Sequence, residues 1–164
     1  MKRYAVAFTG PSGSGKTTII EKIAKELIKT KEVAIIKHDP KDKAIFDTKG
    51  KDSYKFSQTG AEVVVISPTR TTYFSKRDKK LDEIISMLDY FDILLVEGLK
   101  TLPLPRIAIF RNKIDENYLD YSEAIAIDET INIKEYNIPK KIDVLNLNNT
   151  NEIINWIEKN AKKV

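Results

Sequence analysis

The chain has 164 residues, a length typical of one domain with a buried core. It contains no cysteine and one histidine, which excludes disulfide scaffolds, thiolate metal sites and multi-histidine metal centres. Lys and Arg outnumber Asp and Glu by 28 to 24, but the lysines alternate with acidic residues, as on a solvated surface. With no long apolar run and no signal peptide, we expect one domain over residues 1–164 in the cytoplasm, binding neither nucleic acid nor membrane.

The first elements in chain order form a strand–helix–strand unit. Short apolar runs predict buried strands at Tyr4–Thr9 and Val33–Lys37. Between them, residues 16–30 carry apolar side chains at helical spacing opposite a charged face, which predicts an amphipathic helix. Two strands joined by a helix are expected to lie parallel, with a right-handed crossover.

The rest of the chain continues to alternate strands and helices. Strands at residues 62–67 and 71–74 meet at a proline-containing turn and are expected to form a β-ribbon that extends from the core. The other predicted elements are helices at residues 53–59, 80–90 and 151–162, and strands at residues 92–96, 106–110, 124–127 and 144–147. This order predicts an α/β fold with three α/β/α layers and a mostly parallel central sheet.

Residues 10–17 read GPSGSGKT and match the Walker A pattern of a phosphate-binding P-loop, between a buried strand and a helix. Half of the six glycines of the chain lie in this loop: Gly10, Gly13 and Gly15. Glycine lets the backbone close on an anion, so that the N–H groups of the loop, Ser12 included, and of the helix start face phosphates. Lys16 would contact the β and γ oxygens, and the Thr17 hydroxyl would bind Mg²⁺. The alternative is a glycine turn that only caps a helix.

Charged side chains follow two of the other predicted strands. One strand ends at Glu97, at the carboxyl edge of the sheet where ligands bind, and Glu97 is predicted to hold a metal-bound water or orient an attacking one. Another ends at Lys37, His38 and Asp39, which are expected to face the phosphates. Asp39 is the predicted second acid near the metal. For His38, a proton carrier, a phosphate contact and a hydrogen-bonded strand-end residue are all open.

Residues 112–115 read NKID after a predicted strand and resemble the N-K-x-D guanine-recognition motif of GTPases. In that motif the aspartate accepts hydrogen bonds from the N1–H and 2-amino groups of guanine, which adenine does not offer. A chance match is the alternative, because the chain is rich in Asn, Lys and Asp. Asn112 and Asp115 are therefore candidate base-reading residues.

Several segments together resemble the molybdopterin-guanine dinucleotide biosynthesis protein B (MobB) family of the P-loop NTPase superfamily. These segments are FTGPSGSGKTTIIEKI, IIKHD, GKDSYKFSQTGAEVVVISP and DILLVEGLK. The resemblance implies a P-loop NTPase fold, a preference for GTP with Mg²⁺, slow GTP hydrolysis and a homodimer. It also implies a role beside the guanylyltransferase that joins GMP to molybdopterin, with molybdopterin as a further expected ligand.

The resemblance also assigns residues to functions. Phosphate binding falls on six residues of the loop: Gly13, Ser14, Gly15, Lys16, Thr17 and Thr18. Metal contact falls on Thr17 and Glu97, while Lys37, His38 and Asp39 line the site. Residues 50–54 form a functional loop for the pterin or for a dimer contact, with an ordinary solvated loop as the alternative. The chain from about Asp115 onward carries no matching motif.

Three functional hypotheses follow. The first is a GTP-binding accessory protein of molybdenum cofactor biosynthesis that assists attachment of GMP to molybdopterin. It would be a weak Mg²⁺-dependent GTPase, with Lys16, Glu97 and Asp39 as catalytic residues, and would act mainly as a nucleotide-binding adapter. The second is a P-loop small-molecule kinase that transfers the γ-phosphate of ATP or GTP, with Arg70 and Arg77 as candidate lid residues. The third is a binding module whose nucleotide only orders a partner interface.

Overall fold

The computed structural model describes residues 3–164, and the chain divides into two compact units. The first unit comprises the residues up to His38 together with Tyr90–Val164, and the second unit is Asp39–Asp89. The prediction of one nucleotide-binding domain over residues 1–164 stays a prediction. Within residues 3–164, none of the helices combines the length and the apolar content needed to cross a bilayer.

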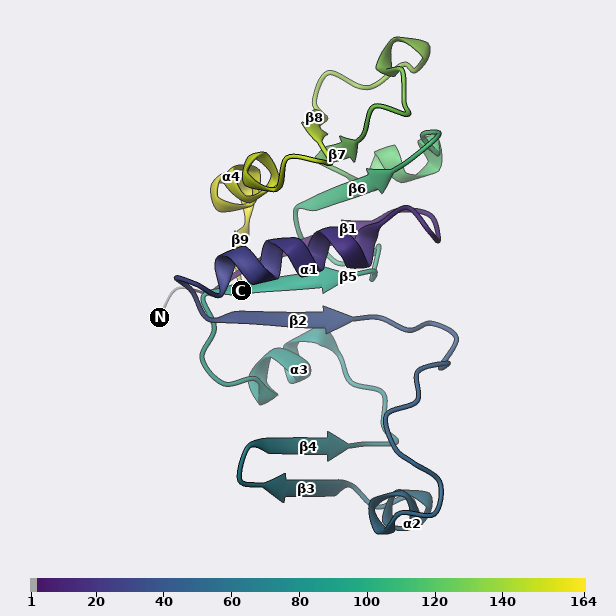
Figure 1. Ribbon diagram of the computed structural model, residues 1–164, viewed down its shortest axis with the longest axis vertical. Coiled ribbons are helices and arrows are strands. Elements are labelled where there is room, and N and C mark those ends of the chain that lie inside the picture. Colours follow the sequence, from purple (N-terminus) through teal and green to yellow (C-terminus); the bar gives the residue numbers. More distant parts are fainter. Residues whose placement is uncertain (1–2) are drawn as a thin grey trace. The chain divides into compact units, whose positions relative to one another are not determined.

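The first unit is built on a sheet with the strand order β2–β5–β1–β6–β7–β8 (Figure 1). Its strands are β1 (Tyr4–Thr9), β2 (Val33–Lys37), β5 (Ile93–Glu97), β6 (Arg106–Phe110), β7 (Ala124–Ile127) and β8 (Asp143–Asn146). Every neighbouring pair along this path is parallel. The predicted α/β fold with a mostly parallel central sheet is confirmed, and the carboxyl ends of its strands meet at one edge.

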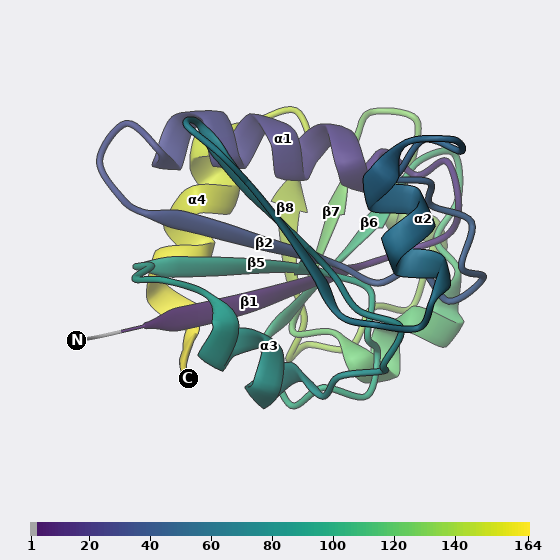
Figure 2. The ribbon, with the colours of Figure 1, turned by 90° about the horizontal axis from the view of Figure 1, so that it is seen from below.

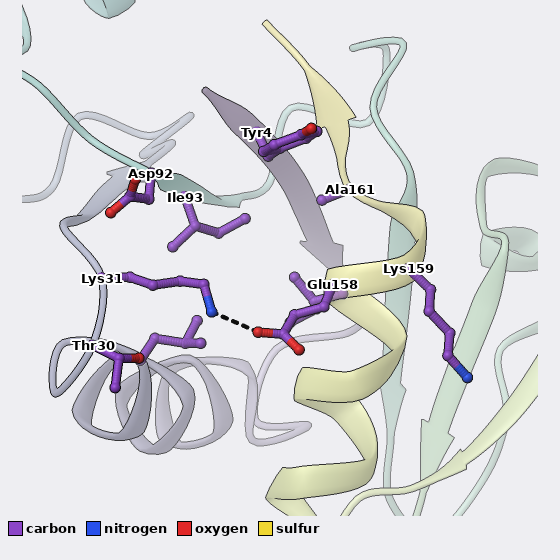
Figure 3. A pocket seen from close by; sticks show the side chains of 10 residues that line it. Tyr4, Thr30, Lys31, Asp92, Ile93, Glu158, Lys159 and Ala161 are labelled. Atoms are coloured by element: carbon purple, nitrogen blue, oxygen red, sulfur yellow. Dashed lines mark hydrogen bonds and ion pairs between the residues drawn. The ribbon is translucent and has the colours of Figure 1, made fainter. Parts of the chain in front are cut away.

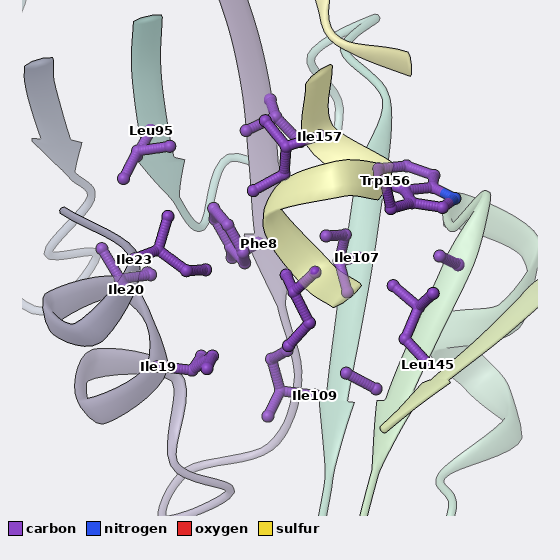
Figure 4. Close-up of a cluster of buried hydrophobic side chains, with 14 of the residues drawn as sticks. Phe8, Ile19, Ile20, Ile23, Leu95, Ile107, Ile109, Leu145, Trp156 and Ile157 are labelled. Atoms are coloured by element: carbon purple, nitrogen blue, oxygen red, sulfur yellow. The ribbon is translucent and has the colours of Figure 1, made fainter. Parts of the chain in front are cut away.

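Two α-helices cover one face of this sheet, α1 (Lys16–Leu27) and α4 (Thr150–Asn160) (Figure 2). Side chains that alternate along the strands pack against these helices to form the main core (Figure 4). Its largest members include Phe8, Ile23, Ile107, Ile153, Trp156 and Ile157. On the opposite face, a smaller cluster lies between β6, β7 and the short 3₁₀ helix η1 (Glu116–Tyr121). The core therefore fixes α1, and with it the loop that precedes α1, against β1.

The end of the chain differs from the prediction of a helix that runs to residue 162. Helix α4 ends at Asn160, and Lys162–Lys163 form β9, which pairs antiparallel with the start of β1. The physical reason is that β6 pairs with β1 only from Ala7 onward, so the first residues of β1 have an open side. The last residues of the chain occupy this side, and the Val164 N–H donates to the Arg3 carbonyl at 3.0 Å.

The second unit contains α2 (Asp52–Gln58), β3 (Val63–Ser67), β4 (Arg70–Phe74) and α3 (Leu81–Met87). Strands β3 and β4 form a two-stranded antiparallel sheet that is not hydrogen-bonded to the central sheet. The predicted β-ribbon is thus confirmed as an element of its own. Several of its apolar side chains are exposed, with Val64 at 53% and Ile66 at 79%.

A cavity of about 660 Å³ lies at the amino ends of β1 and β5, at the opposite edge of the sheet from the phosphate loop (Figure 3). Tyr4 and Ile93 form part of its lining. At its rim, the Lys31 ammonium pairs with the Glu158 carboxylate at 2.6 Å and joins the segment after α1 to α4. Such a surface ion pair contributes at most about 1 kcal/mol to stability. The packing of α1 and α4 therefore depends mainly on the apolar core.

Trp156 gives a test of how α4 is attached to the sheet. Its indole N–H donates to the Asp143 carboxylate of β8 at 2.7 Å, and the side chain is buried. Trp156→Phe keeps an aromatic ring and removes this hydrogen bond, so the free energy of unfolding should fall by about 1.5–3 kcal/mol. Urea unfolding followed by circular dichroism measures the change. Asp143→Asn keeps an acceptor and should lose less, and equal losses in the two variants would contradict this account.

Candidate nucleotide-binding site

The phosphate loop joins β1 to α1 through glycines with positive φ. Gly10 has φ +137°, and a Cβ at this position would lie 2.4 Å from the Ile109 carbonyl oxygen, so only glycine fits there. Gly15 has φ +95° and is the N-cap of α1, with no side-chain hydrogen bond to the helix. The first N–H groups of a helix have no partner within it. The loop therefore presents backbone donors in the way that an anion requires.

Lys16 and Ser14 have polar groups inside this loop. The Lys16 ammonium donates to the carbonyls of Gly10 at 2.9 Å and Pro11 at 2.6 Å. Burial lowers the pKa of Lys16; Glu97 opposes this change, and Lys37 and Lys100 add to it. The Ser14 hydroxyl is buried and has no hydrogen-bond partner among residues 3–164. A concentrated positive potential and an unpaired buried hydroxyl both fit a phosphate chain.

The predicted metal residues lie together beside the loop. Lys37 and Glu97 are partners in the register of β2 and β5, and the Lys37 ammonium lies 3.0 Å from both carboxylate oxygens of Glu97. Thr17, Lys37 and Glu97 also contribute to the lining of a largely apolar cavity of about 350 Å³ formed by residues of α1, β2 and β5, so the argument for a metal rests on their oxygen donors. A hydroxyl and a single carboxylate are the hard oxygen donors that Mg²⁺ uses when substrate phosphates supply further ligands. Thr17 and Glu97 would therefore suit a magnesium ion that is bound together with phosphates.

His38 and Asp39 follow β2 and have different surroundings. The backbone N–H of His38 donates to the Glu97 carbonyl at 3.0 Å, which places His38 at the end of β2. The role of its imidazole stays a prediction with the three alternatives open. The Cβ of His38 would lie 3.1 Å from a Cβ at Gly98, where φ is +92°, so glycine at this position lets the two strand ends come close. Asp39 belongs to the second unit, where its carboxylate accepts from the Ala44 N–H at 2.7 Å. Its proposed catalytic role stays a prediction.

The NKID segment after β6 has local structural functions. The Asp115 carboxylate caps η1 by accepting from the Asn117 backbone N–H at 3.1 Å and from the Asn117 side chain at 2.9 Å. Asn112 has φ +65°, and its N–H donates to the Thr130 hydroxyl at 2.8 Å. Base reading by Asn112 and Asp115 stays a prediction beside these functions.

The structure shows three hydrogen bonds from the Arg106 side chain that the sequence did not predict, and we call this group of bonds the clamp. Arg106 begins β6, is 1% exposed, and its guanidinium donates to the carbonyls of Gly98, Leu99 and Leu102 at 2.9, 3.0 and 3.1 Å. Arginine at a strand start is typical of a surface position, so no sequence signal marked it. The clamp fixes the loop that follows Glu97.

Two further cations near the phosphate loop were also missed. Lys100 lies in the loop after Glu97, and its ammonium is 3.8 Å from the centroid of the Tyr118 ring. The charge of Lys100 contributes to the lowered pKa of Lys16. Arg111, directly after β6, lies against Gly15. Lys100 belongs to the quoted VEGLK segment, and Arg111 precedes NKID, so their places next to motifs were the only available signals.

Comparison with known proteins identifies relatives that cover most of the chain. The family model described as Molybdopterin guanine dinucleotide synthesis protein B matches residues 5–129. A Haemophilus influenzae protein named molybdopterin-guanine dinucleotide biosynthesis adapter protein is 32% identical over 161 residues, which cover 93% of this chain and 86% of that protein. A Methanocaldococcus jannaschii protein also named as such an adapter is 34% identical over 146 residues. That alignment covers 85% of this chain but only 59% of the archaeal protein.

Solved structures agree on the fold. The crystal structure of Bacillus subtilis MobB superposes with a TM-score of 0.74 at 22% identity, covering 97% of this chain and 98% of that one. Another structure, of a molybdopterin-guanine biosynthesis protein B, gives a TM-score of 0.72 at 20% identity, covering 94% and 98%. At these identities the structural likeness supports the fold alone, whereas the family model supports membership. The chain belongs to the molybdopterin guanine dinucleotide synthesis protein B family.

Proposed function

We propose that this protein is a GTP-binding adapter of molybdenum cofactor biosynthesis that assists the attachment of GMP to molybdopterin. Relatives from Haemophilus influenzae and Escherichia coli are named molybdopterin-guanine dinucleotide biosynthesis adapter proteins. The observation that carries the proposal is the phosphate loop of a family member. Its three glycines have positive φ, and its lysine is folded onto the loop. We place the protein in the cytoplasm, with the guanylyltransferase as partner and molybdopterin as a further ligand.

The proposed chemistry is weak Mg²⁺-dependent hydrolysis of GTP. The loop N–H groups and Lys16 would bind the phosphates, and Lys16 would neutralise charge that develops on the β and γ oxygens. Thr17 and Glu97 would hold the magnesium ion, which polarises the terminal phosphate when bound. Lys37, whose ammonium pairs with the Glu97 carboxylate at 3.0 Å, would add positive charge beside the phosphates. Lys16 and Thr17 lie on α1, Lys37 on β2 and Glu97 on β5, and these elements belong to the sheet and the helix layer of the first unit.

We also propose that the protein is a homodimer through its β-ribbon. The ribbon is a sheet of only two strands, and such a hairpin is marginally stable in water without further packing. Its exposed apolar side chains and open strand edges would gain stability from a second copy. Light scattering at micromolar concentration should give the mass of two chains, and Ile66→Asp should shift it toward one. A monomeric parent would contradict this part of the proposal.

Calorimetric titration of one purified sample tests the nucleotide specificity. GTP should bind more tightly than ATP, and removal of Mg²⁺ should weaken GTP binding, because Thr17 and Glu97 would hold an ion whose charge offsets that of the phosphates. In the same preparation, adding the protein to a guanylyltransferase assay should raise the yield of molybdopterin guanine dinucleotide. Failure to bind any nucleotide would refute the proposal. Efficient ATP-dependent phosphorylation of a small alcohol would favour the kinase alternative.

A further inference from the structure

Arg111 is the first residue after β6, and its side chain reaches the phosphate loop. Its guanidinium carbon lies 3.4 Å from the position that a Cβ would take on Gly15, so the side chain lies beside this glycine. Gly15 caps the end of α1 at which helix N–H groups meet an anion. The Arg111 side chain is 43% exposed, so a ligand in the loop can contact it. The P-loop pattern itself requires no arginine at this point.

A nearly buried carboxylate orients this arginine. Strands β6 and β7 pair in parallel up to the residues just before Arg111 and Asp128, which places the two side by side. The Nε atom of Arg111 lies 3.4 Å from Oδ2 of Asp128, whose side chain is 9% exposed. The Thr130 hydroxyl donates to Oδ1 of Asp128, and the Asn112 N–H donates to that hydroxyl. Asp128 is thus fixed by its own partners, and it engages the Nε side of the guanidinium.

The two terminal amino groups of Arg111 remain for a ligand. Among residues 3–164, they take part in no hydrogen bond. A planar guanidinium with two parallel N–H donors matches two oxygens of one phosphate group, a geometry that a lysine ammonium cannot reproduce.

The position along the loop indicates which phosphate Arg111 meets. Lys16, the residue that contacts the β- and γ-phosphates, places its ammonium at the carbonyls of Gly10 and Pro11, at the start of the loop. Gly15 lies at the other end, where α1 begins, and the backbone N–H groups of such a loop cradle the α- and β-phosphates. We infer that Arg111, oriented by Asp128, binds the α-phosphate of the guanine nucleotide. This inference rests on the proposed nucleotide-binding function and adds a specific contact to it.

Calorimetry with GTP, GDP, GMP and ATP on four variants tests the inference. Arg111→Met keeps its side chain beside Gly15 and removes the charge, so affinity for GTP, for GDP and for GMP should fall by the same factor, about tenfold or more, because GMP retains the α-phosphate alone. The ratio of GTP to ATP affinity should not change, because every one of these nucleotides has an α-phosphate. Arg111→Lys should recover part of the affinity, and Asp128→Asn should lose less than Arg111→Met. Lys140→Ala, an exposed lysine outside the site, should bind like the parent.

The outcomes separate this inference from the proposed function. If the parent binds no nucleotide, the proposed nucleotide-binding site is wrong, and the role of Arg111 in it is wrong as well. If the parent binds GTP and Arg111→Met binds it equally well, only the Arg111 contact is overturned. A loss for GTP without a loss for GDP would place the contact on the γ-phosphate, and a loss for GTP and GDP without a loss for GMP would place it on the β-phosphate. A changed GTP-to-ATP ratio would place it on the base. Any of these results refutes the α-phosphate assignment. Melting temperatures confirm that each variant is folded, and Arg111→Lys serves if the methionine variant is not.

Discussion

Lys16→Ala should abolish Mg²⁺-dependent GTP binding. The Lys16 ammonium lies inside the loop on two backbone carbonyls and is the one cation that the Walker A pattern requires at the β- and γ-phosphates. Charge-assisted hydrogen bonds contribute about 1.5–3 kcal/mol each, so the loss of two such contacts lowers affinity by a factor of about 100 or more. Calorimetry with GTP and Mg²⁺ measures this directly.

Lys22→Ala is the matched control for this substitution. Lys22 lies on the same helix as Lys16 and is exposed, so its removal should leave GTP affinity unchanged.

The pH dependence of GTP binding gives a second check on Lys16. Burial lowers the pKa of Lys16, so the ammonium should lose its proton at a lower pH than an exposed lysine does. GTP affinity should then fall as pH rises through that lowered pKa, and Lys16→Arg should lack this fall. Unchanged GTP binding by Lys16→Ala would show that the nucleotide lies elsewhere.

Arg106→Met should lower the free energy of unfolding by about 3 kcal/mol or more. Arg106 is buried and is the hydrogen-bond donor for three carbonyls of the loop after Glu97. A buried carbonyl left without a donor costs about 1–3 kcal/mol, and water entering a relaxed loop recovers part of that cost. The loop also contains Leu99 at φ +51°, a strained conformation for a residue other than glycine, which the clamp stabilises.

The same loop offers an exposed counterpart for comparison. The Lys162 ammonium donates to the Pro103 carbonyl at 3.0 Å at the surface, so Lys162→Ala should change stability by less than about 0.5 kcal/mol. Arg106→Lys keeps the charge with fewer donors and should lie between the parent and Arg106→Met. Urea unfolding of all four proteins gives the comparison. If Arg106→Met unfolds at the same urea concentration as the parent, the buried clamp is not what stabilises this loop. If Arg106→Met does not fold, the comparison of Arg106→Lys with the parent tests the clamp.

The central sheet was predictable because its strands are short apolar runs between polar segments. Residues 106–110 are the clearest example: all five are buried, and the predicted and observed bounds agree. The phosphate loop was predictable for a different reason, since its glycines and Lys16 act through the backbone of one continuous segment. Glu97 and Lys37 followed from a general rule, because parallel strands bring their carboxyl ends to one edge.

The parts that could not be predicted depend on contacts between distant segments. Arg111 meets Asp128 only because β6 and β7 pair in one particular register, and no local pattern encodes that register. Arg106 has the sequence environment of a surface cation, although the fold buries it under three carbonyls. Strand β9 has two residues, too few for any periodicity, and it forms because β1 has an open side at its start.

The pairing of β9 with β1 also determines where a probe can be attached. Val164 is hydrogen-bonded to Arg3, one residue before β1 begins, while the phosphate loop begins directly after β1 ends. Six residues of strand span about 20 Å at roughly 3.3 Å per residue. A dye or a surface tether attached at Val164 would therefore lie a full strand length from a nucleotide in the loop. With a fluorescent nucleotide as the second label, that separation is short enough for efficient energy transfer, so the transfer signal would report whether the loop is occupied. Occupancy of the loop could then be followed one molecule at a time.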